Sequence, residues 1–234
     1  MRLNVILTSY NRPAFLARAL DSLLAQTDPR WYGIVMDDGS DAATIDVLKA
    51  KRYRHPQLKR LCHPQVTPAE RARTTRYSVL INEAYDYAAH IGLDASGGVV
   101  GYLCDNTEYA PELVATVLDF FDRRPDVYAG YVTQARDSWQ GDAHGDGVAH
   151  LGGAELYGHW AHMPGVLAER IMHPRGQLDH SQVFHRLPCE VRWSEAVEHK
   201  AHGDAVFFER LVTRYGPIYA IAPGRALTKE HLVK

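Results

Sequence analysis

The sequence predicts an α/β fold, in which a mainly parallel sheet is covered by helices on both faces. Residues 5–7 and 34–36 are short runs of purely apolar side chains, as expected for strands that are buried on both faces. Between these runs, apolar residues recur at helical spacing from residue 15 to residue 24. Strand, helix and strand in this order predict a βαβ unit, the building block of parallel sheets.

Polar side chains follow both strands of this unit. Thr8 and Tyr10 come after the first strand, and Asp38 comes after the second. In open parallel sheets, ligands bind outside the carboxyl ends of the strands. We therefore expect Thr8, Tyr10 and Asp38 to lie on one rim of a ligand site.

Further helices and strands are expected along the chain, each from the periodicity of its apolar residues. In order, we expect a short helix at 42–51, a strand at 58–62, a long helix at 70–90, a buried strand at 99–103, an amphipathic helix from Pro111 and a strand at 127–132. Arg71 and Arg76 fall near the amino end of the long helix, where charge spacing alone indicates either a solvated first turn or a ligand site.

Residues 137–176 show little periodicity and are rich in glycine and histidine, which predicts long loops and short antiparallel strands. A stretch of this length is unlike a simple connector, so we expect it to bind an acceptor or to form a lid. His159 and His162 could share a helical face as zinc ligands, but no third ligand has suitable spacing.

Composition excludes several classes of function. With 234 residues, 46% hydrophobic and 23% charged, the chain can bury a full core and is expected to form a single compact domain. A net charge of -2 without a run of basic residues argues against a nucleic-acid partner. No apolar run predicts a membrane span and no signal sequence is apparent, so we expect a cytoplasmic protein. The three cysteines are far apart and predict neither a disulfide framework nor a zinc site.

Six sequence motifs carry a resemblance to a known family. They are TSYNR, MDDGSD, TRYSVLIN, YLCDNTEYAP, LDHSQVFHR and GDAVFFERL, in this order. In this order they resemble the family 2 nucleotide-diphospho-sugar transferases of the GT-A fold, in the branch of the spore-coat polysaccharide glycosyltransferase. The resemblance covers nearly the whole chain. It implies one GT-A domain with a Rossmann-like sheet, in which residues 1–110 bind the nucleotide sugar and the loop-rich residues 111–234 bind the acceptor and carry catalysis.

The resemblance also implies a set of donor-binding residues. They are Thr8, Tyr10, Arg12, Asp38, Arg71, Arg76, Asn82 and Asp105. The chemistry agrees, because a guanidinium can hold a phosphate through two parallel N–H donors.

A divalent cation, Mn²⁺ or Mg²⁺, is the cofactor that the resemblance implies, with Asp105, Asn106 and His231 as its ligands. Such a cation would neutralise the diphosphate as its bond to the sugar breaks. This sequence departs from the family, which usually has two or three acidic residues here, by placing Cys104 and Asn106 beside Asp105. Asn106 adds no charge, so we expect weaker metal binding. The alternative is that Asp105 merely caps the end of a strand.

Asp204 matches the position of the family's catalytic base, and Asp179 matches a segment that closes the floor of the active site. Asp204 precedes an apolar helix, so a capping role is the simpler alternative, although capping and catalysis can coexist. Trp193, His199 and His202 are candidates for acceptor binding, and surface residues of these types would be equally ordinary.

The function implied is transfer of a sugar, with inversion, from UDP or dTDP to a hydroxyl of a glycan or small metabolite. One alternative is a nucleotide-sugar-binding protein that has lost catalytic turnover, because the metal motif at Cys104-Asp105-Asn106 has fewer acidic residues than the family usually has. A sugar nucleotidyltransferase is disfavoured, because no glycine-rich phosphate loop follows the first strand. Neither GxGxxG nor GxxxxGK[ST] occurs after a predicted strand, which disfavours dinucleotide oxidoreductases and P-loop kinases. The oligomeric state is not predicted.

Overall fold

The computed structural model describes residues 1–93, 97–136, 170–171, 178–199, 203–223 and 225–231. Its centre is an eight-stranded sheet with the order β3-β2-β1-β4-β9-β6-β10-β8. In that order, the strands are Leu58–Cys62, Trp31–Asp37, Leu3–Ser9, Val99–Cys104, Val183–Arg186, Ala129–Tyr131, Ile218–Ala220 and Arg170–Ile171. A smaller sheet pairs β5 (Thr107–Tyr109), β11 (Ala226–Glu230) and β7 (Thr133–Arg136).

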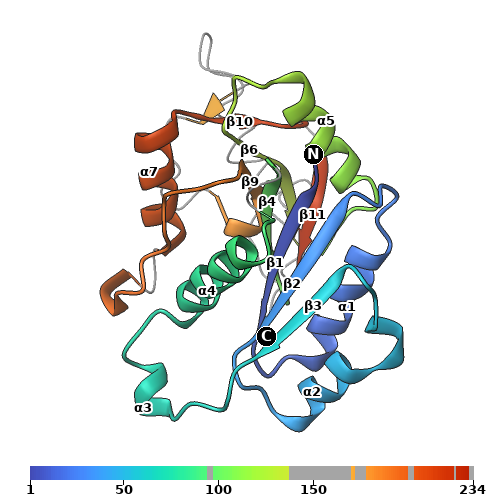
Figure 1. Cartoon of the computed structure of the whole chain (residues 1–234), viewed down its shortest axis with the longest axis vertical. Helices are drawn as coiled ribbons and strands as arrows, with labels where there is room; N and C mark the ends of the chain where they lie inside the picture. Colours follow the sequence, from blue (N-terminus) through green and yellow to red (C-terminus); the bar gives the residue numbers. More distant parts are fainter. Residues whose placement is uncertain (94–96, 137–169, 172–177, 200–202, 224, 232–234) are drawn as a thin grey trace, which may run out of the picture.

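Helices cover both faces of the large sheet (Figure 1). One face packs against α1 (Pro13–Leu24), α2 (Ala42–Lys49) and α5 (Leu113–Arg123), and the other against α4 (Arg76–His90) and α7 (Gly203–Tyr215). Alternate residues of β1 point to opposite faces of the sheet: Val5 packs on the face covered by α1, α2 and α5, and Ile6 on the face covered by α4 and α7. The first βαβ unit forms as predicted, with β1 parallel to β2 over seven residue pairs from Leu3 to Ser9.

The predicted helix at 70–90 is two helices, and this expectation is corrected. A single turn, α3 (Pro68–Arg71), is closed by a capping box between Thr67 and Glu70, and α4 begins only at Arg76. Thr75 breaks the helix, because its N–H donates to the carbonyl of Glu195 at 2.9 Å. Residues 70–76 contain a single apolar side chain, so periodicity does not mark where the helix begins, and the contact with a distant segment does.

Other boundaries differ by a few residues. The predicted helix 42–51 ends at Lys49 and is followed by a 3₁₀ turn, η1 (Lys51–Tyr53). The helix expected from Pro111 begins at Leu113, and β6 occupies only the middle of the predicted strand 127–132. Among the described residues, no helix combines the length and apolar character needed to cross a membrane.

Strand β9 is the late segment that joins the two halves of the sheet. It runs antiparallel to β4 on one side and to β6 on the other. Because of this direction, the 3₁₀ turn η2 (His180–Gln182), which immediately precedes β9, lies at the edge where β1, β2 and β4 end. Residues near 180 therefore meet residues near 8, 38 and 105.

Candidate active site

A pocket of about 450 Å³ lies at the carboxyl ends of β1, β2 and β4, beside the first turn of α4. Its lining residues are Thr8, Ser9, Tyr10, Arg12, Asp38, Arg71, Arg76, Tyr77, Leu80, Cys104, Asp105 and His180. The structure thus brings the predicted donor-binding residues together, with the exception of Asn82. Their roles toward a nucleotide stay predictions.

Asp38 lies at the base of this pocket and is 2% exposed. Both carboxylate oxygens accept hydrogen bonds from guanidinium groups: Arg76 Nε donates to Oδ1 at 3.0 Å, and Arg71 Nη1 forms an ion pair with Oδ2. The Arg71 guanidinium also lies 3.6 Å from the centroid of the Tyr10 ring. A planar group with N–H donors, the Arg71 guanidinium, therefore stacks on Tyr10 and binds Asp38 in this structure.

Asn82 is the predicted donor residue that lies outside the pocket lining, and its role toward the donor stays a prediction. Its amide nitrogen donates to the carbonyl of Trp193 at 3.0 Å and to Glu195 Oε1 at 2.9 Å, while its Oδ1 accepts from Trp193 N. The side chain thereby fastens α4 to residues 193–195. Its role in this structure is to hold that segment in place.

Asp105 ends β4 and is paired with Arg12. Arg12 Nη1 lies 3.2 Å from Asp105 Oδ1, and the backbone N–H of Tyr10 donates to Oδ2 at 3.4 Å. Burial raises the pKa of Asp105 above its ordinary value, against the opposing effect of the Arg12 charge. Arg12 therefore compensates a carboxylate that is largely removed from water.

The other two predicted metal ligands have different partners. Asn106 donates from its amide nitrogen to the carbonyl of His231 at 3.2 Å. The ring of His231 contacts Glu108 through Nε2 and lies 3.5 Å from Arg18 Nη1 through Nδ1. The backbone brings these residues together, since His231 N donates to Asn106 O at 2.7 Å, but the side chains do not converge.

A divalent cation at this position does not fit the donor set. It would find one carboxylate, Asp105, that already carries a guanidinium. The neighbouring Cys104 is a poor ligand too, because Mn²⁺ and Mg²⁺ prefer oxygen donors to the soft sulfur of a cysteine. As placed in this structure, Asp105, Asn106 and His231 do not form an oxygen-rich site of the kind that Mn²⁺ or Mg²⁺ prefers. Their role as metal ligands stays a prediction.

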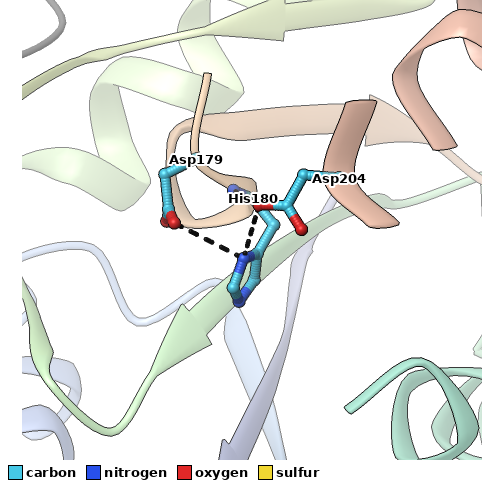
Figure 2. Close-up of side chains that lie close together, drawn as sticks. All are labelled: Asp179, His180 and Asp204. Carbon is cyan, nitrogen blue, oxygen red and sulfur yellow. Dashed lines mark hydrogen bonds and ion pairs between the residues drawn. The ribbon is translucent and has the colours of Figure 1, made fainter. Parts of the chain in front are cut away.

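Asp179, His180 and Asp204 form a cluster beside the pocket, with potential ligand atoms within 4.8 Å of one another. Figure 2 shows His180 between the two carboxylates: its Nδ1 lies 3.2 Å from Asp204 Oδ2 and 3.6 Å from Asp179 Oδ2. Burial lowers the pKa of His180, but Cys104 and the two carboxylates outweigh burial and hold the pKa well above its ordinary value. A protonated imidazole therefore offsets one of the two carboxylate charges of this cluster.

Asp204 is placed by α7, in whose first turn it lies. Its Oδ2 accepts from the backbone N–H of His180 at 3.1 Å, and its Oδ1 accepts from the Tyr77 hydroxyl at 3.2 Å. Gly203 allows this contact, because a Cβ at that position would lie 1.9 Å from the Tyr77 hydroxyl oxygen. Burial raises the pKa of Asp204, but the charge and hydrogen bonds of His180 outweigh it, so that the pKa lies below its ordinary value. Asp204 is thus an oriented, ionised carboxylate.

Asp179 has a different role from Asp204. It precedes η2 and caps it, with Oδ1 accepting from the Ser181 N–H at 2.9 Å and with Gln182 completing a capping box. Because Asp179 binds the turn that it caps, it fixes the backbone conformation of η2 and thereby the position of His180.

The lining residues that were not predicted from the sequence as site residues include Tyr77, Cys104 and His180. A signal for two of them existed, since Cys104 is the last residue of β4 and His180 lies within the LDHSQVFHR motif. Tyr77 was expected on the apolar face of its helix, and only the packing of Gly203 against its hydroxyl reveals its contact with Asp204.

The predicted acceptor-binding residues differ in their surroundings. Trp193 is 2% exposed and stacks on Phe207 with ring centroids 4.3 Å apart, so its ring packs in the core of this structure. Its contact with an acceptor stays a prediction. His199 is half-buried in the 3₁₀ turn η3 (Val197–His199), where its Nδ1 lies 2.6 Å from Ser194 Oγ. His202, His159, His162 and most of the predicted acceptor loop at 137–176 lie outside the described residues.

The sequence is similar to a family profile and to curated proteins over most or half of its length. The sequence profile described as Glycosyl transferase family 2 matches residues 4–174. Protein CgeD of Bacillus subtilis (strain 168) is 31% identical over 220 residues, which cover 90% of this chain and 46% of CgeD. An uncharacterized glycosyltransferase of Nostoc sp., alr2836, is 27% identical over 122 residues, covering 52% of this chain and 33% of that protein. The chain therefore spans less than half the length of these curated relatives.

Solved structures show the same fold. S. aureus TarS 1-349 in complex with UDP-GlcNAc matches with a TM-score of 0.65 at 14% identity, over 100% of this chain and 59% of that chain. A mannosyltransferase, PcManGT from Pyrobaculum calidifontis, in complex with GDP-Man and Mn²⁺, matches with a TM-score of 0.58 at 16% identity, over 100% of this chain and 57% of that chain. These likenesses confirm the predicted α/β fold class.

Proposed function

This chain belongs to glycosyl transferase family 2, as its motifs predicted, and from that premise we propose that it transfers a sugar from a nucleotide diphosphate to an acceptor hydroxyl. The observation that carries the proposal is the pocket at the carboxyl edge of β1, β2 and β4, where arginines and buried carboxylates meet. The place of this pocket in the sheet is the one where open α/β sheets bind their ligands.

The donor we propose is a sugar linked to UDP or dTDP. Either pyrimidine presents an imide N–H, from which Asp38 would accept a hydrogen bond, and an aromatic face that Tyr10 would stack against. The base would thereby take the place that the Arg71 guanidinium has in this structure. The complexes of TarS with UDP-GlcNAc and of PcManGT with GDP-Man support a nucleotide sugar as the class of donor. The sugar itself and the acceptor, a glycan or a small metabolite, are not specified by these residues, and a cytoplasmic reaction stays a prediction of the sequence.

Asp38→Ala is expected to weaken UDP binding by about tenfold or more, because a buried imide N–H would lose its acceptor. Isothermal titration calorimetry measures this directly. Inorganic pyrophosphate is the matched probe, since it has no base and should bind the variant at least as well as the parent protein. If both ligands weaken equally, Asp38 acts only by holding Arg71 and Arg76, and the base assignment is wrong.

Asp204 is the general base in this proposal, and the transfer inverts the anomeric centre. The acceptor oxygen attacks the anomeric carbon on the face opposite the diphosphate, its bond to carbon forms as the bond to the diphosphate oxygen breaks, and its proton passes to Asp204. The lowered pKa of Asp204 keeps the carboxylate ionised near neutral pH and therefore able to accept this proton. His180 and Tyr77 orient it through their hydrogen bonds.

The predicted cofactor, Mn²⁺ or Mg²⁺, would supply positive charge to the departing diphosphate. Mn²⁺ is present in the PcManGT complex, which supports a metal in relatives of this fold. In this chain the donor set around Asp105 does not fit such a cation, so we assign no step of the transfer to one.

A second candidate function is binding of a nucleotide sugar without turnover, which the dispersed metal ligands favour. The experiment that separates the two begins with a thermal-shift screen of nucleotide diphosphates, with and without manganese. Release of the free nucleotide from the best-bound nucleotide sugar is then followed in the presence of candidate acceptors. Binding together with release supports transfer, whereas tight binding with no release across acceptors supports the second function.

A further inference from the structure

Arg12 occupies a notable position in the donor pocket. It follows β1 directly, lines the pocket and places Nη1 3.2 Å from Asp105 Oδ1. Its side chain is 42% exposed, whereas that of Asp105 is 7% exposed. The guanidinium therefore reaches from the pocket onto a buried carboxylate with much of its surface still open to a ligand.

The charged groups that line the pocket are unequal in number. Arg12, Arg71 and Arg76 face two carboxylates, Asp38 and Asp105. Arg71 and Arg76 both bind Asp38, and Arg71 also lies over the Tyr10 ring. Arg12 is the guanidinium that pairs with Asp105.

The residues expected to hold a metal ion at this end have other contacts. Asn106 directs its amide nitrogen to a backbone carbonyl, and His231 directs its ring to Glu108 and Arg18. A divalent cation bound by Asp105 would lie beside the Arg12 guanidinium and be repelled by it. A divalent cation and the Arg12 guanidinium therefore compete for the same place beside Asp105.

We propose that Arg12 provides the positive charge for the donor diphosphate in this chain, in the place where the family resemblance implied a divalent cation. The inference rests on the proposed function, because it concerns the same donor pocket. A guanidinium carries five N–H donors, and among the described contacts Arg12 uses its Nη1 group on Asp105, which leaves donors for phosphate oxygens. Arginine stabilises a diphosphate in the same sense as a cation, through charge and through paired hydrogen bonds.

The first test is calorimetric titration of the whole chain with UDP and with inorganic pyrophosphate, in a chelator and then in manganese. We expect the dissociation constant of each ligand to change by less than about threefold between the two conditions. Binding of UDP that is at least about tenfold tighter in manganese would overturn the proposal.

Arg12→Ala is expected to weaken both ligands by about tenfold or more in chelator. Arg12→Lys keeps the charge but loses the planar fork, so its affinity should fall between those of the parent protein and the alanine variant. Arg30→Ala is the matched control, because Arg30 precedes β2 at the opposite end of the sheet, where it binds Asp28. Unchanged affinity in a folded Arg12→Ala protein would overturn the proposal.

A double variant tests the exchange of arginine for metal. Arg12→Ala combined with Asn106→Asp removes the guanidinium and adds a second carboxylate beside Asp105. We expect UDP binding by this variant to become dependent on manganese, with a gain of about tenfold over the value in chelator. If the double variant binds UDP weakly and equally in chelator and in manganese, Arg12 does not occupy the position of a metal ion and the proposal is overturned.

Pyrophosphate separates failure of this inference from failure of the proposed function. If pyrophosphate binds in chelator and depends on Arg12, but UDP binds no more tightly than pyrophosphate, the arginine site stands and nucleotide recognition fails. If UDP binds only with manganese, the nucleotide function stands and the inference fails.

Discussion

Asp204→Asn should leave a folded protein that binds the donor normally but transfers the sugar about 100- to 10,000-fold more slowly, the usual effect of losing a general base. The carboxylate is held by the backbone N–H of His180 and by the Tyr77 hydroxyl, and asparagine preserves its shape. Its Oδ1 can still accept a hydrogen bond, but the amide cannot take a proton from the acceptor hydroxyl. The measurement is the initial rate of nucleotide release with a saturating donor, beside donor binding by calorimetry.

Asp179→Asn is the matched control for this prediction. Asp179 lies in the same cluster but caps η2, so its replacement should reduce stability by roughly 1 kcal/mol and leave most of the transfer rate. A folded Asp204→Asn protein with full turnover, beside an inactive Asp179→Asn protein, would exchange the roles of the two carboxylates.

Trp193→Ala should destabilise the protein by roughly 3 to 5 kcal/mol. The indole is 2% exposed, stacks on Phe207 and meets Tyr102 edge-on with ring centroids 5.2 Å apart. Removing it would leave a cavity between α4, α7 and the sheet. Because a domain of this kind is usually stable by about 5 to 15 kcal/mol, the loss is a large part of the total. Urea denaturation followed by circular dichroism measures it.

Trp193→Phe is the control, because it retains a ring against Phe207 and should lose much less stability than the alanine variant. Trp193 was predicted to touch the acceptor, and the two roles give different results. A core role changes the denaturation midpoint and leaves the KM for the acceptor unchanged in the phenylalanine variant. Wild-type stability of Trp193→Ala together with a raised acceptor KM would restore the acceptor role.

The strands of the donor half could be predicted because their sequences allow one interpretation. Residues 5–7 and 34–36 are apolar on every side, and such runs suit strands that are covered on both faces. The polar residues after them had to meet at one edge, since parallel neighbours end together. Thr8, Tyr10 and Asp38 were therefore predictable as neighbours.

Side-chain direction at the expected metal site could not be predicted in this way. The motif correctly indicated that Asn106 and His231 come together, and their backbones do so. Whether the His231 ring faces Asp105 or Glu108 depends on contacts between β5 and β11, which are not encoded in the spacing of the motif. The break before α4 is similar, because Thr75 is held by residues about 120 positions later in the chain.

Strand β9 also determines when the site can form during folding. The segment that carries His180 enters the sheet between β4 and β6, two strands that come much earlier in the chain. During synthesis the chain leaves the ribosome from its amino end, and amino-terminal parts fold first. The parallel strands β1, β2 and β4 can therefore pair beforehand and gather Asp38, Arg12 and Asp105. A chain emerging from the ribosome should acquire affinity for pyrophosphate before β9 and α7 add His180 and Asp204, so that it acquires its base last.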